Sequence, residues 1–215
     1  MVHENCANWI FRRYQRGGTF EGMPTPRTTV HRLPRRATYD RAAIDAILDE
    51  AFVAHVGIVD GGQPFVIPMA YVRVGDAVYL HGAIASRLLK NAASAPTLCC
   101  TVTLLDGLVL AKSAFHHSMN YRSVVVLGQG RAVVGPEKDQ ALAALVDKLE
   151  AGRSAHARAP NDKELAATAV VALGLSEASA KVREGGPLDD PDDLALPVPA
   201  GVVPLALVRG AFVPS

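Results

Sequence analysis

Apolar residues recur along the chain at helical spacing in several segments. Residues 41–51 and 136–149 each carry one apolar stripe, with charged and polar side chains at the remaining positions. This periodicity predicts an amphipathic helix of about three turns in the first segment and another in the second, which begins with proline, a residue suited to the first helical turn. Shorter helices are predicted to begin near Ser86 and to cover residues 162–167.

The other apolar segments are rich in β-branched residues and are separated by turn signals, a pattern typical of strands. The sequences Asp60-Gly61-Gly62 and Asp106-Gly107 predict tight turns. Strands are predicted at residues 52–59, 63–73, 77–82, 97–105, 108–112, 121–134, 169–175 and 202–212. Because tight turns join antiparallel neighbours, we expect a mainly β fold with flanking helices, in which about six to eight strands form an antiparallel split or closed barrel.

Two segments qualify this pattern. Pro68 lies inside a predicted strand, and a proline cannot donate a hydrogen bond to a neighbouring strand. Pro68 therefore predicts an edge, a bulge or a place where something other than a strand lies alongside. Residues 179–193 are polar and contain glycine, and no strand is predicted there.

The N-terminal segment differs from the rest of the chain. Residues 1–27 show no sustained periodicity, and glycines and prolines would interrupt anything longer than a helical turn around Trp9. We expect residues 1–27 to form an N-terminal arm, flexible or laid over the body, and residues 28–215 to form one domain.

Composition excludes several classes of function. The formal net charge is +1, which gives no electrostatic basis for a nucleic-acid or membrane-surface partner. No apolar run has the length of a membrane span, and the N-terminus lacks the features of a signal peptide. Three cysteines, two of them adjacent (Cys99 and Cys100), are not a disulfide framework. We therefore expect a reducing, cytoplasmic compartment.

Residues 79–96, YLHGAIASRLLKNAASAP, contain the clearest candidate binding site. A strand reaches Gly82, and a turn of small residues leads to a helix with Ser86 at its N-cap and Arg87 next to it. A helix start with free N–H groups, a hydroxyl and a guanidinium suits a phosphate. The alternative is a capped surface helix whose arginine points into water.

The order of the motifs carries a resemblance to a known family. The chain contains, in order, HVGIVDGGQPFVIPMAY, YLHGAIASRLLK and CCTVTLLDGLVLAKSAFHHSMNYRSVVVLGQGRAV. Over residues 28–212 it resembles the pyridoxamine 5′-phosphate oxidase-like, FMN-binding split-barrel proteins, and especially the branch related to 5-nitroimidazole-resistance reductases. The resemblance implies a homodimer that binds FMN at the subunit interface. It does not by itself identify the substrate.

The resemblance also implies positions for the flavin's neighbours. A strand would pass the flavin ring, the next strand would flank the ribityl chain, and the helix start would hold the phosphate. The residues implied are Pro68, Met69, Ala70 and Tyr71 at the ring, Tyr79, His81 and Gly82 at the ribityl chain, Ser86, Arg87 and Lys90 at the phosphate, and Asn120, Tyr121, Arg122, Ser123, Lys181 and Arg183 from the neighbouring subunit. A positive charge from Lys112 or Arg122 would stabilise a reduced flavin anion, and the sequence does not say which.

The expected function is that of an FMN-dependent oxidoreductase that acts on a small planar substrate with electrons from a nicotinamide donor. His55 is the candidate catalytic residue, because related nitroimidazole reductases have a histidine in a comparable strand; the alternative is a structural strand histidine. Two other functions remain open: a non-catalytic flavin carrier or redox sensor, and a haem-binding split barrel, since some relatives bind haem through histidine.

Two further observations narrow these expectations. The chain has no tryptophan after Trp9, whereas the oxidase proper grips its substrate with a C-terminal arginine and tryptophan motif. This argues against pyridoxamine phosphate oxidation. The adjacent pairs Cys99-Cys100 and His116-His117 point to opposite faces of a strand, so no resident metal site is expected.

Overall fold

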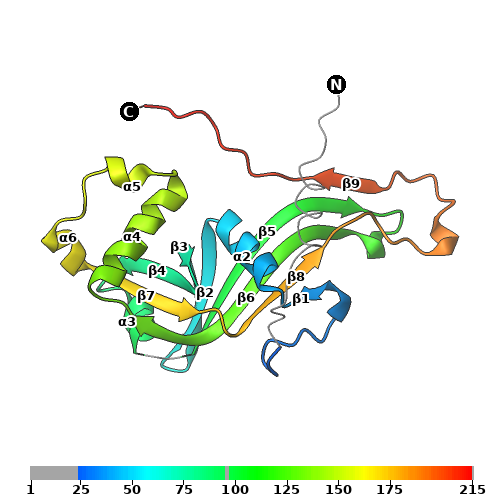
Figure 1. Ribbon diagram of the computed structural model, residues 1–215. Coiled ribbons are helices and arrows are strands. Elements are labelled where there is room, and N and C mark those ends of the chain that lie inside the picture. Colours follow the sequence, from blue (N-terminus) through cyan, green and yellow to red (C-terminus); the bar gives the residue numbers. More distant parts are fainter. Residues whose placement is uncertain (1–23, 95–96, 215) are drawn as a thin grey trace.

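The computed structural model describes residues 24–94 and 97–214, in which antiparallel strands are flanked by helices (Figure 1). The strands are β1 (Ala37–Thr38), β2 (Val53–Asp60), β3 (Gln63–Val74), β4 (Ala77–Ala83), β5 (Thr97–Leu110), β6 (Ser118–Ala132), β7 (Thr168–Gly174), β8 (Ala178–Arg183) and β9 (Gly201–Pro204). The helices are α2 (Arg41–Glu50), α3 (Arg87–Ala93), α4 (Pro136–Leu149), α5 (Arg153–His156) and α6 (Asp162–Ala167).

Hydrogen-bonded neighbours close into a ring of strands. The order β6-β7-β4-β3-β2-β5 returns to its start, because β5 also pairs with β6 over most of its length. β8 and β1 extend the sheet from β6, and β9 extends it from β5. Every pairing is antiparallel, which confirms the predicted split barrel. The long β5–β6 hairpin points away from the side that carries α4, α5 and α6 (Figure 1).

Strand β3 changes neighbours along its length. Residues 63–70 pair with β2, whereas residues 71–74 pair with β4. Pro68 pairs with His55 of β2, and none of the described strands pairs with its other side. The prediction that Pro68 marks an edge is therefore confirmed. A proline costs no ladder hydrogen bond on a side that has no neighbour.

The predicted turn at Asp106-Gly107 is wrong. Strand β5 runs unbroken from Thr97 to Leu110, and the pair lies at a register shift against β6. A β-carbon on Gly107 would lie 3.1 Å from the carbonyl oxygen of Val203, so glycine is needed where β9 approaches. The glycine signal is real, but it marks a bulge and a close contact between strands.

Strand β8 was not predicted, because residues 178–183 contain polar side chains and lack a continuous run of apolar residues. Pairing with β6 on one side and β1 on the other makes this segment a strand. With β1 and β8, the described residues contain more strands than expected. Tertiary pairing overrides local composition here.

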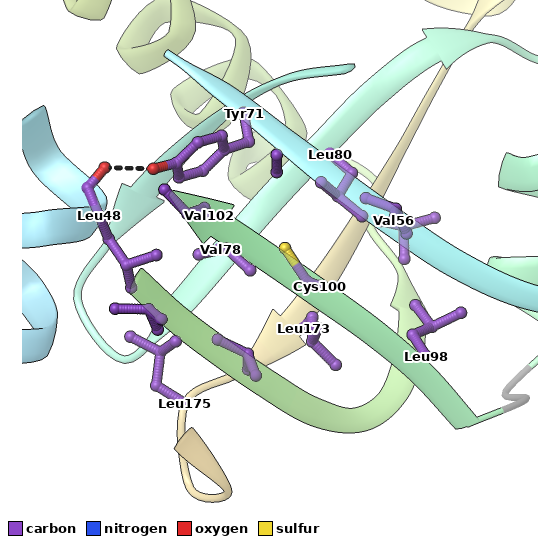
Figure 2. Packing of buried hydrophobic residues seen from close by; sticks show 14 of the residues in the cluster. Leu48, Val56, Tyr71, Val78, Leu80, Leu98, Cys100, Val102, Leu173 and Leu175 are labelled. Atoms are coloured by element: carbon purple, nitrogen blue, oxygen red, sulfur yellow. Dashed lines mark hydrogen bonds between the residues drawn. The ribbon is translucent and has the colours of Figure 1, made fainter. Parts of the chain in front are cut away.

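The main core fills the ring and joins it to α2. Figure 2 shows side chains from β2, β4, β5 and β7 meeting there, among them Val56, Leu80 and Val102. Tyr71 is the largest fully buried side chain, and its hydroxyl donates to the carbonyl oxygen of Leu48 at 2.6 Å. This bond satisfies the hydroxyl and fixes the end of α2 over the barrel.

A second, smaller core lies on the outer face of β3, β4 and β7, where α4 packs. Its buried members include Val72, Tyr79 and Leu145. Tyr79 donates its hydroxyl to Glu137 in the first turn of α4 at 2.8 Å, and Arg131 pairs with the same carboxylate at 2.6 Å. These two contacts hold the start of α4 on the barrel.

The Glu137 contacts predict an acid-dependent loss of stability. Hydrogen bonds from Arg131 and then Tyr79 lower the pKa of Glu137 from its usual 4.5 to about 2. A depressed carboxyl pKa contributes stability above the unfolded value, and the contribution is lost as pH falls through the folded value. The free energy of unfolding of the wild type should therefore decline more steeply than that of Glu137→Gln between those two pH values. Urea midpoints across that window test this, and parallel curves would contradict it.

The N-terminal segment is described from residue 24 onward. Thr25 donates to Glu177 at 2.8 Å, and Arg27 pairs with the same carboxylate. The predicted helical turn around Trp9 lies outside the described residues. The boundary between an arm and a domain stays a prediction. None of the helices in the described ranges has the length and apolar character needed to span a bilayer.

Candidate functional site

A cavity of about 690 Å³ lies between the barrel and the segment that runs from α4 to α6. One wall consists of the outward side of β3, β4 and β7, where Ala70, His81 and Thr168 lie. The other wall comes from α4, α5, α6 and their connections, and most of the lining is apolar. A volume of this order is typical of sites for cofactors or small molecules.

The apolar stripe of α4 explains why a cavity forms there. Leu145 is buried against the barrel, whereas Leu149, at the end of the helix, is 62% exposed. Leu142, Val146 and Leu149 all line the cavity. The stripe therefore continues beyond the barrel surface that it packs on, and leaves an apolar wall without a packing partner.

The far wall is held by local contacts. Asn161 and Glu164 form a capping box at the start of α6. Arg158 pairs with Glu164 at 2.7 Å, and both line the cavity. These contacts fix the loop between α5 and α6 and compensate the charge of Arg158.

His81 lies on β4, two residues after Tyr79, and pairs with Val170 of β7. Its side chain lines the cavity, and its Nδ1 atom is fully buried without a hydrogen-bond partner among the described residues. Burial lowers the pKa of His81, so the imidazole is neutral near pH 7.

Lys148 brings a positive charge to the cavity. Its Nζ atom lies 3.8 Å from the centroid of the Tyr71 ring and donates to the carbonyl oxygen of Leu48 at 2.9 Å. Burial lowers the pKa of Lys148 to about 8. The ammonium group is thus held by an aromatic face and a carbonyl.

The structure brings some of the predicted flavin neighbours to this cavity and not others. Ala70, Tyr71 and His81 line it. Tyr79 is buried under α4, and Gly82 packs against Leu89, whose Cδ1 atom would lie 3.0 Å from an added β-carbon. The remaining predicted residues that lie outside the cavity lining are Pro68, Met69, Ser86, Arg87, Lys90, Asn120, Tyr121, Arg122, Ser123, Lys181, Arg183 and His55.

The helix predicted to begin near Ser86 is α3, which starts at Arg87. Ser86 is the N-cap residue, but its hydroxyl makes no capping hydrogen bond. Arg87 is 62% exposed, lies 5.0 Å above the Phe65 ring and is 3.6 Å from the carboxylate of Asp60. Lys90 is exposed one turn later. The start of α3 therefore carries an uncommitted hydroxyl and a loosely held guanidinium.

The residues predicted to reach a neighbouring subunit lie on β6 and β8. Arg122 donates to Asp106 at 2.8 Å and to Glu50, and these hydrogen bonds, first the one to Glu50, raise the pKa of Arg122. Ser123 donates to the carbonyl oxygen of Lys181 at 3.3 Å. Asn120 bonds the buried Arg183. The charge of Arg122 is therefore already compensated by acidic side chains of the same chain. Tyr121 is half-buried.

His55 lies on β2, where it is paired with Pro68 of β3, and it is exposed. Sequence reasoning missed Phe52, Lys148 and Arg158, which line the cavity. The sequence signal for this wall is the apolar stripe of residues 136–149, which predicts an amphipathic helix without saying that part of its apolar face lines a cavity. Within residues 24–94 and 97–214, no three histidine, cysteine or acidic side chains are grouped so as to hold a metal ion.

Comparison with known proteins identifies the family. A family model described as pyridoxamine 5′-phosphate oxidase matches residues 40–182, which include every strand from β2 to β7. The chain belongs to this family. The resemblance inferred from the motifs is thus confirmed. Among curated proteins no match is found.

Two solved structures of the family resemble almost the whole chain. The flavocytochrome Anf3 from Azotobacter vinelandii is 43% identical, with a TM-score of 0.85 over 89% of this chain and 90% of that chain. The FAD and Heme binding protein from Mycobacterium smegmatis is 37% identical, with a TM-score of 0.81 over 84% of this chain and 89% of that chain.

A 5-nitroimidazole antibiotic resistance protein from Bacteroides thetaiotaomicron shares the fold. It is 23% identical, with a TM-score of 0.57 over 68% of this chain and 86% of that chain. At this identity the likeness concerns the fold alone.

Proposed function

We propose that this chain is a redox protein that binds both a flavin and a haem. Two relatives support this, because one is a flavocytochrome and the other is an FAD and Heme binding protein. The proposal combines two functions that the sequence left as alternatives. It favours FAD over the expected FMN, since FAD is the flavin named for a relative.

The observation that carries the haem half of the proposal is His81. A haem needs an apolar slot and an axial ligand, commonly a neutral histidine. The cavity is mostly apolar and of suitable size, and the neutral imidazole of His81 lies in its wall. The residues therefore fit the group. We assign His81 as the iron ligand.

Other residues of the cavity have supporting roles. Phe52, Leu142 and Leu149 would exclude water from the macrocycle. When bound, haem and flavin supply one-electron and two-electron redox chemistry. The chain itself contributes orientation, exclusion of water and hydrogen bonding.

We place the flavin at the strands β3 and β4, with its phosphate end at the corner of Ser86 and Arg87. A free hydroxyl and an exposed guanidinium support this position. Electrons from a nicotinamide donor and a small planar substrate remain part of the proposal. His55, exposed beside Pro68, stays the candidate catalytic residue.

We also propose a homodimer. Large apolar side chains are exposed on β2 and β3, and others are exposed on β5 and β9, away from the cavity. Exposed apolar surface of this kind supports an interface between two copies. Its exposed members on these strands include Val53, Val59, Val66, Ile67, Leu105, Leu108, Leu110, Val202 and Val203. A cytoplasmic location stays a prediction.

The test is the absorption spectrum of the full chain, purified from cells that were supplied with a haem precursor. The molar mass of the same sample in solution tests the proposed dimer. We expect a Soret band together with the two broad flavin bands, and reduction of the flavin by NADH or NADPH. The mass of the released flavin separates FAD from FMN. Flavin without a Soret band would overturn the haem half, and a colourless protein would overturn the whole proposal. Reduction by neither donor would favour a flavin carrier.

Arg87→Ala should weaken flavin binding and leave haem binding intact. Loss of one charge-assisted hydrogen bond to a phosphate corresponds to a roughly tenfold to hundredfold weaker affinity. Titration of the apoprotein with flavin measures this affinity. Arg73→Ala is unsuitable as a control, because the Arg73 side chain forms a salt bridge with Asp49 that the substitution would remove. Lys163→Ala, on the exposed side of α6, is the control. Unchanged flavin affinity in Arg87→Ala would contradict the placement of the phosphate.

A further inference from the structure

Lys148 is a cation that lines the cavity, and among the described residues no acidic side chain forms a salt bridge with it. Its Nζ atom has two close partners, the Tyr71 ring at 3.8 Å and the carbonyl oxygen of Leu48 at 2.9 Å, and both are uncharged. The same carbonyl also accepts the Tyr71 hydroxyl at 2.6 Å. A half-buried ammonium has three N–H donors, so Lys148 has donors left over.

The charged neighbours of Lys148 are occupied or too far away. Asp49, which adjoins Leu48, is paired with Arg73 at 2.6 Å. Asp139 also lines the cavity, but in the described structure it lies beyond ion-pair distance of Lys148.

Arg158 gives a useful comparison. It lines the same cavity, and its guanidinium is met by Glu164 at 2.7 Å. The two cations of the lining therefore differ: one has a counter-ion within the chain and the other does not. Placing a charge in a mostly apolar cavity is costly unless a partner of opposite sign arrives.

Lys148 and His81 stand on different walls of the cavity, one on α4 and the other on β4. A molecule that filled the space between them would contact the imidazole of His81 on one side and the ammonium group of Lys148 at its edge. The Tyr71 ring under the ammonium restricts how far the lysine can move.

We propose that Lys148 binds an acidic substituent of the cavity's ligand, so that the site selects a tetrapyrrole bearing free carboxylates. The inference rests on the proposed haem function and adds to it the group that orients the macrocycle. A carboxylate at Lys148 forms a charge-assisted hydrogen bond in a water-poor site, where such bonds are strong. Lys148 acts here as a specificity-determining residue.

The experiment compares two probes on the full-length apoprotein, haemin and haemin dimethyl ester, which differ only in whether the two carboxylates are free. Affinities are measured by absorbance titration. The wild type should bind haemin about tenfold or more tightly than the ester. Lys148→Met keeps the aliphatic bulk and removes the charge, so it should lose this preference while its affinity for the ester stays the same.

Two variants keep the comparison sharp. Lys148→Arg should restore most of the preference, because it returns a cation to the site. Lys138→Met is the matched control: Lys138 is on the same helix and donates to the carbonyl oxygen of Leu165 at 2.7 Å, but it does not line the cavity. Its preference for haemin should equal that of the wild type.

Full retention of the haemin preference by Lys148→Met would overturn the inference and leave the haem function standing. Equal weakening of both probes would also overturn it, because that result indicates a damaged cavity. If the wild type bound neither probe, the proposed haem function would fail, and this inference with it.

Discussion

The His81→Ala variant is expected to lose its Soret band and to keep its flavin absorption in full. His81 is the neutral imidazole in the cavity wall, and no other histidine of the described residues lines that cavity. Removing an axial ligand should lower haem affinity by at least about a hundredfold, since even outer-shell partners of metal ligands are worth tenfold to a hundredfold. Ser86 and Arg87, at which we propose that the flavin phosphate binds (the flavin corner), do not line the cavity, so flavin binding should be unaffected.

A structural role for His81 would produce a different result. If the imidazole only filled space, then alanine would lower stability without a specific spectral change. Adding free imidazole to His81→Ala should restore a Soret band, because a small ligand can occupy the vacated position. His117→Ala is the control, since that ring is exposed and bonds the carbonyl oxygen of Ser113 at 3.0 Å. A full Soret band in His81→Ala would contradict the assignment.

Local signals predicted the elements whose form is decided by neighbours in sequence. Gly61 and Gly62 have φ values of +57° and +82°, so the Asp-Gly-Gly turn between β2 and β3 requires glycine. Asp40 caps α2 through a hydrogen bond to the backbone N–H of Ala43 at 3.1 Å. The helix at 162–167 has the predicted bounds, because its capping box is encoded within four residues.

Elements that depend on distant pairing were missed. The bulge at Asp106-Gly107 depends on β9, about a hundred residues later, and β8 depends on β6 and β1. A dipeptide such as Asp-Gly is compatible with a turn or with a bulge, and only the approach of another strand decides between them. The sequence predicted the ring of strands but not these extensions.

The cavity lining also combines residues that the sequence singled out with residues that it did not. Ala70, Tyr71 and His81, which the resemblance placed beside a flavin, line the cavity. Lys148 was missed because a lysine in an amphipathic helix is usually solvated. Its burial depends on where α4 ends relative to α2, which no local pattern encodes. Likewise, Leu149 belongs to the apolar stripe that predicts this helix, and the structure places Leu149 in the cavity lining.

Gly130→Ala is expected to be the most destabilising single substitution near the flavin corner. Gly130 lies on β6 beneath the end of α3, where an added β-carbon would overlap the carbonyl oxygen of Ala92 and lie 3.0 Å from Leu98 Cδ1. Backbone atoms cannot rotate away, so the strand or the helix must move. Overpacking of this kind costs about 3 kcal/mol or more, measured as a shift of the urea midpoint.

Gly128→Ala separates this backbone clash from a general intolerance of alanine in β6. At Gly128 the nearest atom to an added β-carbon is Leu173 Cδ1, at 2.9 Å, and a methyl at the end of a side chain can give way. The expected cost is about 1 kcal/mol. Because α3 starts at the flavin corner, a displaced helix in Gly130→Ala should also weaken flavin binding, whereas Gly128→Ala should bind flavin normally. Equal destabilisation of the two variants would show that Ala92 does not limit the approach of α3 to the barrel, and would remove the link between this glycine and the flavin corner.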